Sequence, residues 1–240
     1  MFDKIVTFAN CVLREKNWGA RSVLIAYISM KIRSIVSTLA LLVVMAMSGQ
    51  MTPRSVVTTA PEKMLLSLDN SILLDMLDYY ESGVARIFKN KANEDSYIVE
   101  MTEKTLTLKT GACHNVSFVI LPYGKSEIIM TIERVETPSI DATISFYDSR
   151  WQLLDTKKML RIPALSDWIG KVSREERADI ENALPFLMVD ATFNPATSTL
   201  TFTPMIGDYV ATENVEKVKS VLAEHLEYVW SGKSFKRVKK

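Results

Sequence analysis

The chain is poor in the residues that most often carry enzyme chemistry. Its 240 residues include two cysteines, two histidines and eight glycines. Cys11 lies among the first 29 residues, so Cys113 is alone in the remainder and we expect no internal disulfide there. Two histidines and one cysteine cannot fill a Cys/His zinc site, although a carboxylate-rich metal site stays open. The glycines form no phosphate-binding loop, dinucleotide fingerprint or Gly-x-Ser-x-Gly elbow, so we expect no cofactor.

Basic residues are scarce outside the C-terminal tail. Six of the 29 Lys and Arg residues and two of the 28 Asp and Glu residues precede residue 50, so residues 50–240 carry a net charge of −3. Five positive charges lie in the last eight residues, KSFKRVKK, which leaves −8 on the rest. This acidic body argues against nucleic-acid binding, because neutralising phosphates requires clustered Lys and Arg. The tail is typical of a solvated, frayed terminus, with a membrane-surface or partner contact as the alternative.

A secretory signal is predicted inside the chain rather than at its start. The stretch MKIRSIVSTLALLVVMAMSGQ, residues 30–50, has a short basic end, an apolar run from Ile35 to Met47, and small residues at Ser48 and Gly49. A transmembrane anchor is the alternative, but a span needs about 20 apolar residues and this run is shorter. No cysteine follows for lipoprotein acylation. We therefore expect a periplasmic or secreted protein without a stable membrane anchor, with residues 30–49 as signal peptide and 1–29 as a start-site artefact.

Helical periodicity appears in three stretches. From Pro61 onward one apolar stripe recurs at steps of three and four and ends at Gly83; it consists of Leu65, Leu68, Ile72, Met76 and Tyr80. Asn70-Ser71 can split this stretch, which would leave a second helix over 72–82. Further helices are predicted over 173–184, where Ser173 can cap, and over 213–223.

Residues 96–162 change to a period of two, which predicts antiparallel strands with one buried and one wetter face. The breaks between the strands are short, so neighbouring strands are expected to pair as a meander. Two hairpins are predicted later, over 187–203 and 226–238. The strands and helices do not alternate as βαβ units. The prediction is therefore one α+β domain over residues 50–240, an antiparallel sheet packed with a few helices.

Three strings carry a resemblance to a known family. They are LLDMLDYYESG at 73–83, ISFYDSRW at 144–151 and YVWSGKSF at 228–235. Together they resemble an uncharacterised family of exported proteins from anaerobic Gram-negative gut-type bacteria, catalogued as a domain of unknown function. The resemblance implies a periplasmic or secreted bacterial protein, and it brings no established activity or catalytic residue.

Candidate catalytic groups are few. Cys113 and His114 are adjacent, and neighbours on a strand point to opposite faces, which argues against a thiol–imidazole pair. Asp75 and Asp78 share one helical face and could hold a cation or act as acid and base, although we favour the simpler interpretation that they form the wet side of an amphipathic helix. A carboxylate enzyme would require these residues and Tyr79 to cluster with Asp141, Asp148 or Asp208.

Aromatic residues are the remaining signal. Several lie at the ends of predicted elements, where rings either pack on a core edge or line a pocket for an apolar or peptide ligand: Tyr79, Tyr80, Tyr147, Trp151, Tyr228 and Trp230. The leading hypothesis is a non-enzymatic periplasmic binding or accessory module for an apolar small molecule or a protein segment. An envelope structural or interaction protein that uses an exposed sheet edge or the basic tail is the alternative. A sheet fully covered on both faces, with no groove, would contradict the leading hypothesis.

Overall fold

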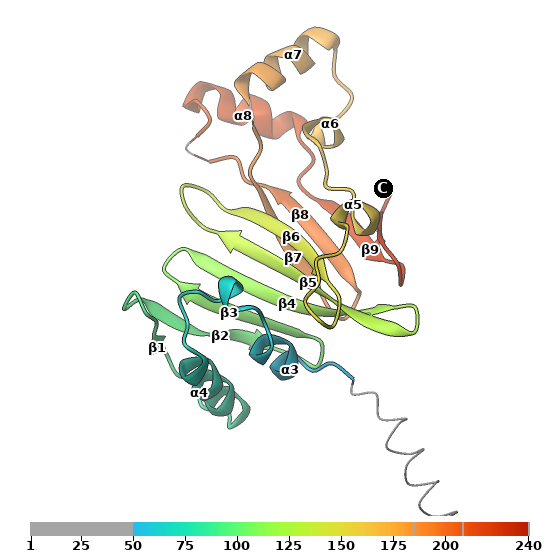
Figure 1. The fold of residues 1–240 in the computed structure, drawn as a ribbon. Helices are drawn as coiled ribbons and strands as arrows, with labels where there is room; N and C mark the ends of the chain where they lie inside the picture. The colour runs from blue at the N-terminus through green and yellow to red at the C-terminus, as the bar shows by residue number, and fades with distance from the viewer. Residues whose placement is uncertain (1–49, 185, 208, 240) are drawn as a thin grey trace, which may run out of the picture. The chain divides into compact units, whose positions relative to one another are not determined.

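A computed structural model describes residues 50–184, 186–207 and 209–239. Within it, Met51–Lys240 forms one compact unit that contains two antiparallel sheets and six short α-helices (Figure 1). This confirms the predicted α+β class. The predicted start-site artefact and signal peptide lie outside the described residues. No helix in the described ranges is both long and apolar enough to span a bilayer.

The first sheet has six strands in sequence order, as a meander requires. The strands are β1 (Phe88–Lys89), β2 (Asp95–Met101), β3 (Thr105–Gly111), β4 (His114–Tyr123), β5 (Ser126–Val135) and β6 (Asp141–Tyr147). The longest pairing joins β4 and β5, from His114↔Val135 to Tyr123↔Ser126. Gly124 takes a positive φ of 62° in the tight turn between them, a conformation that glycine adopts without steric cost.

The second sheet has four strands in the order β10-β9-β8-β7. They form the two predicted hairpins: β7 (Val189–Asn194) with β8 (Thr199–Pro204), and β9 (Leu226–Trp230) with β10 (Phe235–Arg237). Asn194 closes the first hairpin, because its side-chain oxygen accepts a hydrogen bond from the N–H of Ala196 (2.9 Å).

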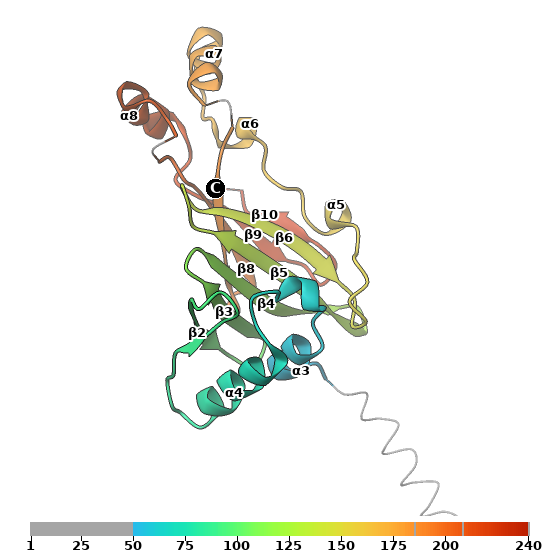
Figure 2. The same cartoon turned by 60° about the vertical axis from the view of Figure 1, so that its left-hand side comes forward.

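One face of the six-stranded sheet is partly covered by the N-terminal helices (Figure 2). These are α3 (Pro53–Thr58), the 3₁₀ turn η1 (Glu62–Met64) and α4 (Asn70–Glu81). Their apolar side chains join Leu106, Leu108 and Phe118 of β3 and β4 in one core. Burial of this amphipathic face, rather than helix propensity, stabilises such short helices.

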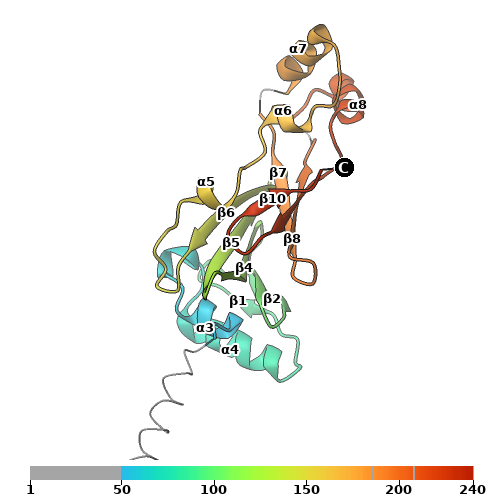
Figure 3. The same cartoon turned by 90° about the vertical axis from the view of Figure 1, so that its right-hand side faces the viewer.

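The other face meets the four-stranded sheet (Figure 3). Val119, Met130 and Phe146 from β4–β6 share a second core with Leu200, Tyr228 and other residues of β7–β10. Arg134 on β5 also donates two hydrogen bonds to the carboxylate of Asp190 on β7, at 2.7 and 2.8 Å. Strands β4 and β5 are therefore buried on both faces along most of their length.

Four more helices connect the strands. Two are single turns, α5 (Thr156–Met159) and α6 (Leu165–Trp168), and two are longer, α7 (Arg174–Ala183) and α8 (Thr212–Val221). Ser173 caps α7 as predicted, since its hydroxyl accepts a hydrogen bond from the N–H of Glu176 (3.1 Å). An ion pair between Lys217 and Asp179 joins α8 to α7 (2.8 Å).

Several element predictions need correction. The helix expected from Pro61 is only the turn η1, because Leu65 leaves helical geometry. Asp69 has an extended backbone and is the N-cap of a new helix, α4. The separate helix predicted near 72–82 is therefore confirmed. The strand pattern ends at Tyr147 rather than Ile162, since a turn follows in which Asp148 accepts the N–H groups of residues 150 and 152. The alternation of buried and wet faces fails for β4 and β5, which lie between two cores.

The sheet is not fully covered on both faces. On the helix side, Val135 of β5 and Thr143 of β6 are exposed, and Glu133 beside them is half-buried. At the edge of the sheet, Val99 of β2 is 51 % exposed. The sheet therefore does not have two fully covered faces, which is the arrangement that would contradict a binding module.

Candidate functional site

The best candidate site begins where helix α4 ends. Gly83 follows the helix with φ +75°, and its N–H donates to the carbonyl of Tyr80, while the N–H of Val84 donates to the carbonyl of Tyr79 (both 2.9 Å). This pair of bonds is the Schellman motif, which needs a residue that tolerates positive φ. It ends α4 as predicted and sends residues 84–87 toward the outer strand of the first sheet.

The outer strand leaves most of its neighbour open. β1 pairs with β2 through two residues only, Phe88↔Ser96 and Lys89↔Asp95. Residues 97–101 of β2 therefore have no strand partner on this side within the described ranges. The register between β2 and β3 shifts between Ile98 and Glu100, so Val99 is the extra residue of a β-bulge. An open strand edge offers backbone groups for pairing with another chain.

A pocket lies between this edge and the segment that leaves α4. It has a volume of about 350 Å³ and is lined by Met76 and Tyr80 of α4, residues 84–87, and Tyr97, Ile98 and Val99 of β2. Its lining includes buried apolar side chains, because Met76 and Ile98 are both buried. A pocket of this kind suits a few apolar side chains.

The walls of the pocket expose apolar surface to solvent. Val84 is 49 %, Ile87 is 61 % and Val99 is 51 % exposed. Single exposed apolar residues are ordinary, but three around one pocket form a patch of the kind that marks interaction sites. We call the pocket, these three residues and the open part of β2 the β2-edge site.

Of the predicted aromatic residues, Tyr80 belongs to the β2-edge site, and Tyr79 lies next to it in contact with Arg86. Tyr80 lines the pocket, and its hydroxyl accepts a hydrogen bond from the N–H of Met101 (3.1 Å). Tyr79 lies at the rim, where its ring meets Phe88 edge-on with centroids 5.8 Å apart. The guanidinium of Arg86 lies 4.7 Å from the centroid of Tyr79 and 5.2 Å from that of Phe88. This cation–π contact fixes the rim and leaves a positive charge beside the pocket.

The other four predicted aromatic residues lie elsewhere. Tyr147 and Trp151 pack on the core under the N-terminal helices, where the Trp151 indole N–H donates to Thr59 Oγ1 (3.2 Å). Tyr228 and Trp230 are buried between the two sheets, and the Trp230 indole N–H donates to the carbonyl of Pro122 (2.8 Å). Burial raises the pKa of Tyr228. The six residues do not form one groove, and a binding role for these four stays a prediction.

The carboxylates proposed for an enzyme are not gathered in one cleft. Asp78 pairs with Arg54 (2.7 Å), and this contact raises the pKa of Arg54. Asp141 accepts the N–H of Val189 (3.1 Å), and Asp148 caps its own turn. Asp208 lies outside the described residues. Within the described ranges no group of three or more His, Cys, Asp or Glu side chains could hold a metal ion.

Cys113 and His114 lie at a second, more open cleft of about 460 Å³. Cys113 sits in the turn between β3 and β4 rather than on a strand, and its thiol is exposed. His114 starts β4, and its Nδ1 is hydrogen-bonded to Thr110 Oγ1 (2.6 Å). Along the described chain no hydrogen bond joins the thiol to the imidazole, so the geometry offers no activated nucleophile.

Residues 84–87 and Val99 are the part of the site that the sequence did not predict. Their signal was present: the run Val84-Ala85-Arg86-Ile87 follows a helix-ending glycine and shows no strand alternation. This run lines a pocket because β1 is only two residues long, and no period in the sequence indicates that length.

Comparison with known proteins agrees with this fold. A search of curated proteins gave no significant match. A solved structure, a domain of an uncharacterized protein from Porphyromonas gingivalis W83, is similar with a TM-score of 0.67 and 18 % sequence identity, covering 76 % of this chain and 96 % of that one. At this identity the likeness shows the fold alone. The family model described as "Protein of unknown function (DUF3256)" matches residues 44–235. This match spans most of the chain and confirms the predicted resemblance to a domain of unknown function, so the protein belongs to the DUF3256 family.

Proposed function

We propose that the protein is an exported, non-enzymatic binding or accessory module that holds an extended apolar segment of a partner protein at the β2-edge site. The observation that carries the proposal is an open strand edge directly beside an apolar pocket. The predicted signal at residues 30–49 supports a periplasmic or secreted location.

The arrangement suits strand addition. In this mode the backbone of an extended peptide pairs with a sheet edge, while its alternate side chains enter pockets. Residues 97–101 supply the edge, and Val99, Ile98 and Tyr80 surround the place where an apolar side chain would enter. The bulge at Val99 and the engaged N–H of Met101 interrupt the edge, so the occupant is a short segment of a few residues.

A protein segment fits the site better than a small apolar ligand does. The pocket is shallow enough to leave Val84, Ile87 and Val99 about half exposed, whereas small-molecule sites bury most of the ligand surface. The unpaired backbone of β2 also offers hydrogen bonds that a lipid-like molecule cannot use.

A peptide-display experiment tests the proposal. A library of random heptapeptides is selected on the wild-type protein and counter-selected on the double variant Ile87→Asp, Val99→Lys, which places charges in the pocket and on the edge. We expect peptides with alternating apolar residues whose affinity falls at least about tenfold on this variant, which corresponds to about 1.4 kcal/mol.

The chain offers a matched control. Leu153 and Ile162 are also exposed, at 67 % and 51 %, but lie outside the β2-edge site. The variant Leu153→Lys, Ile162→Asp should retain the selected peptides. Failure to enrich peptides, or equal loss on both variants, would contradict the proposal. A small apolar molecule retained by the wild-type protein in native mass spectrometry, and lost from the first variant, would replace the peptide as occupant.

A further inference from the structure

The positive charge of the C-terminal tail lies on an ordered part of the second sheet. β10 pairs with β9 through Phe235↔Trp230, Lys236↔Val229 and Arg237↔Tyr228. The Phe235 side chain is buried, and the N–H of Val238 donates to the carbonyl of Glu227 (2.8 Å). The tail is therefore hydrogen-bonded to β9 as far as Val238, and the structure does not show the fraying that the sequence predicted.

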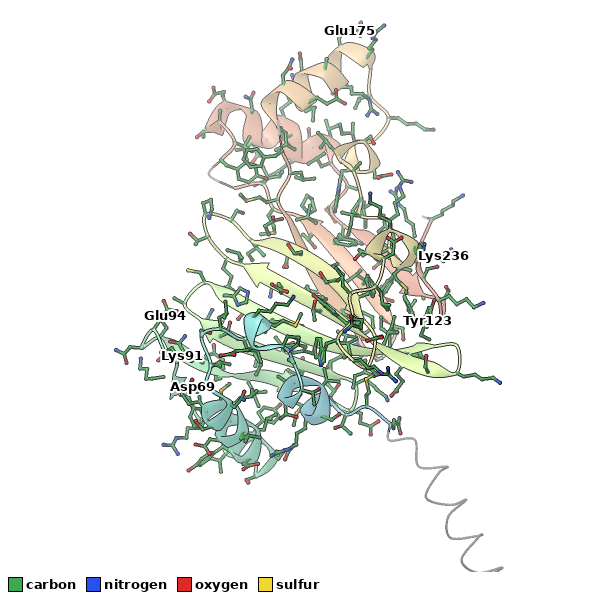
Figure 4. All side chains as sticks on the ribbon, viewed as in Figure 1. Asp69, Lys91, Glu94, Tyr123, Glu175 and Lys236 are labelled. Carbon is green, nitrogen blue, oxygen red and sulfur yellow. The ribbon has the colours of Figure 1, made fainter. Side chains whose placement is uncertain are left out.

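A second basic turn lies beside this hairpin. The N–H of Gly124, in the turn between β4 and β5, approaches the carbonyl of Gly232 in the turn between β9 and β10 (3.4 Å). Lys125 and Lys233 follow these two glycines, so each of the two neighbouring turns carries a lysine. Figure 4 shows Lys236 and Tyr123 on the same side of the molecule, at the right of the view, whereas Asp69, Glu94 and Glu175 lie on other parts of the molecule.

The ammonium groups of the lysines in this region are not engaged in ion pairs with described residues. The nearby Asp167 is already shared by Arg237 (3.4 Å) and Arg161 (3.2 Å). Four exposed lysines make no ion pair with any described residue, and together we call them the basic face: Lys125, Lys233, Lys236 and Lys239. Outside the last eight residues, the sequence from residue 50 carries −8. The four lysines thus add positive charge locally to a chain that is otherwise acidic, with the half-buried Glu227 beside Val238 and Lys239 as a neighbouring carboxylate.

Two exposed valines accompany these lysines. Val229 lies opposite Lys236 in the register and is 38 % exposed, and Val238 is 39 % exposed. Lysine ammonium groups bind phosphates as point charges, and small apolar side chains between them can enter the interface below lipid headgroups. Clusters of four or more basic residues next to a bilayer are typical of binding to anionic lipids.

We propose that the basic face docks on the surface of an anionic phospholipid bilayer. The attraction is peripheral and reversible, since four lysines act additively through the surface potential and salt screens them. The inference uses residues distant in sequence from the β2-edge site and stands whether or not that site binds a peptide. Docking would leave the protein at a membrane surface.

The test is co-sedimentation with vesicles of equimolar phosphatidylglycerol and phosphatidylcholine, and with vesicles of phosphatidylcholine alone. The variant replaces Lys125, Lys233, Lys236 and Lys239 with Gln. The control makes the same change of charge at four exposed lysines elsewhere: Lys63, Lys89, Lys91 and Lys219. All proteins are full-length, so any membrane affinity of residues 1–49 is common to all of them, and a thermal melt confirms that each is folded.

We expect the partition coefficient on phosphatidylglycerol vesicles to fall about fivefold for each lysine removed from the basic face. The control should bind like the wild type, and added salt should weaken binding of both. Equal binding by the basic-face variant and the control, or wild-type binding that does not depend on phosphatidylglycerol, would overturn the proposal.

Discussion

The hydroxyl of Tyr80, on helix α4, accepts a hydrogen bond from the backbone N–H of Met101, near the end of strand β2 (3.1 Å). A helix side chain thus takes the place of a missing strand partner at one point of the sheet edge. The bond ties α4 to β2 and sets the width of the pocket between them. It leaves the edge open toward Ile98, where the pocket lies.

Tyr80→Phe should destabilise the protein by about 1 kcal/mol, because the half-buried N–H of Met101 loses its acceptor. The free energy of unfolding in urea measures this. Tyr79→Phe is the control, since its side chain is at the rim and its ring contacts with Phe88 and Arg86 do not need the hydroxyl. Equal effects of the two changes would argue against the bond.

Gly83→Ala should cost about 1 kcal/mol, because an alanine is strained at φ +75°. Nothing lies within 4 Å of the added Cβ, so the cost is conformational rather than steric. Gly170→Ala provides a comparison, since its added Cβ would make only an ordinary contact with the carbonyl oxygen of Val221 (3.5 Å) and no positive φ is involved. We expect Gly83→Ala to lower the denaturation midpoint clearly more than Gly170→Ala does.

The carboxylate of Glu136 should make stability depend on pH. Its hydrogen bond to Lys109 (3.0 Å), helped by Asn115, holds its pKa below the ordinary 4.5. A lowered folded-state pKa stabilises the fold above the unfolded-state value, and the benefit disappears as the pH falls through the folded-state value. The wild type should therefore exceed Glu136→Gln in unfolding free energy at pH 7, and the difference should shrink steadily below about pH 4.5.

The comparison with Glu103→Gln separates this effect from general acid destabilisation. Glu103 is exposed and lies in the turn between β2 and β3. Within the described residues its carboxylate makes no hydrogen bond or ion pair, so Glu103→Gln removes one negative charge without removing a contact such as that between Glu136 and Lys109. A difference between wild type and Glu136→Gln that does not change with pH would contradict the assignment.

The ion pair of Arg134 and Asp190 should couple the two sheets. The pair has two hydrogen bonds, and the side chains are only 23 % and 14 % exposed. We expect Asp190→Asn to cost about 2 kcal/mol, because the guanidinium loses a charged partner in a partly buried place. In a double-mutant cycle with Arg134→Met the two changes should be far from additive. Additive effects would indicate that the pair contributes nothing beyond packing.

Local patterns in the sequence predicted the local elements well. Helix α4 and its end at Gly83 follow from a regular apolar stripe and a residue that tolerates positive φ. The hairpins of the second sheet follow from short apolar runs joined by turn residues. Each of these signals depends on neighbours in sequence, so one chain is enough to detect it.

Features set by distant contacts could not be predicted in this way. Met130 and Ile129 on β5 are both buried, because separate cores cover the two faces of that strand, and a period of two cannot reveal this. The six aromatic residues were grouped by their positions at element ends, yet three-dimensional packing placed Tyr228 in a core and Tyr79 at a rim. The β2-edge site depends on where β1 stops pairing, and two residues give no period to analyse.

The most direct test of the account is hydrogen–deuterium exchange of the amides in residues 97–101, with and without a peptide from the display selection. Strand addition predicts that exchange slows on binding for those amides of residues 97–101 that face the open edge, while amides in the outer strands of the second sheet keep their rates. Unchanged exchange in residues 97–101 at saturating peptide would contradict strand addition at the β2-edge site.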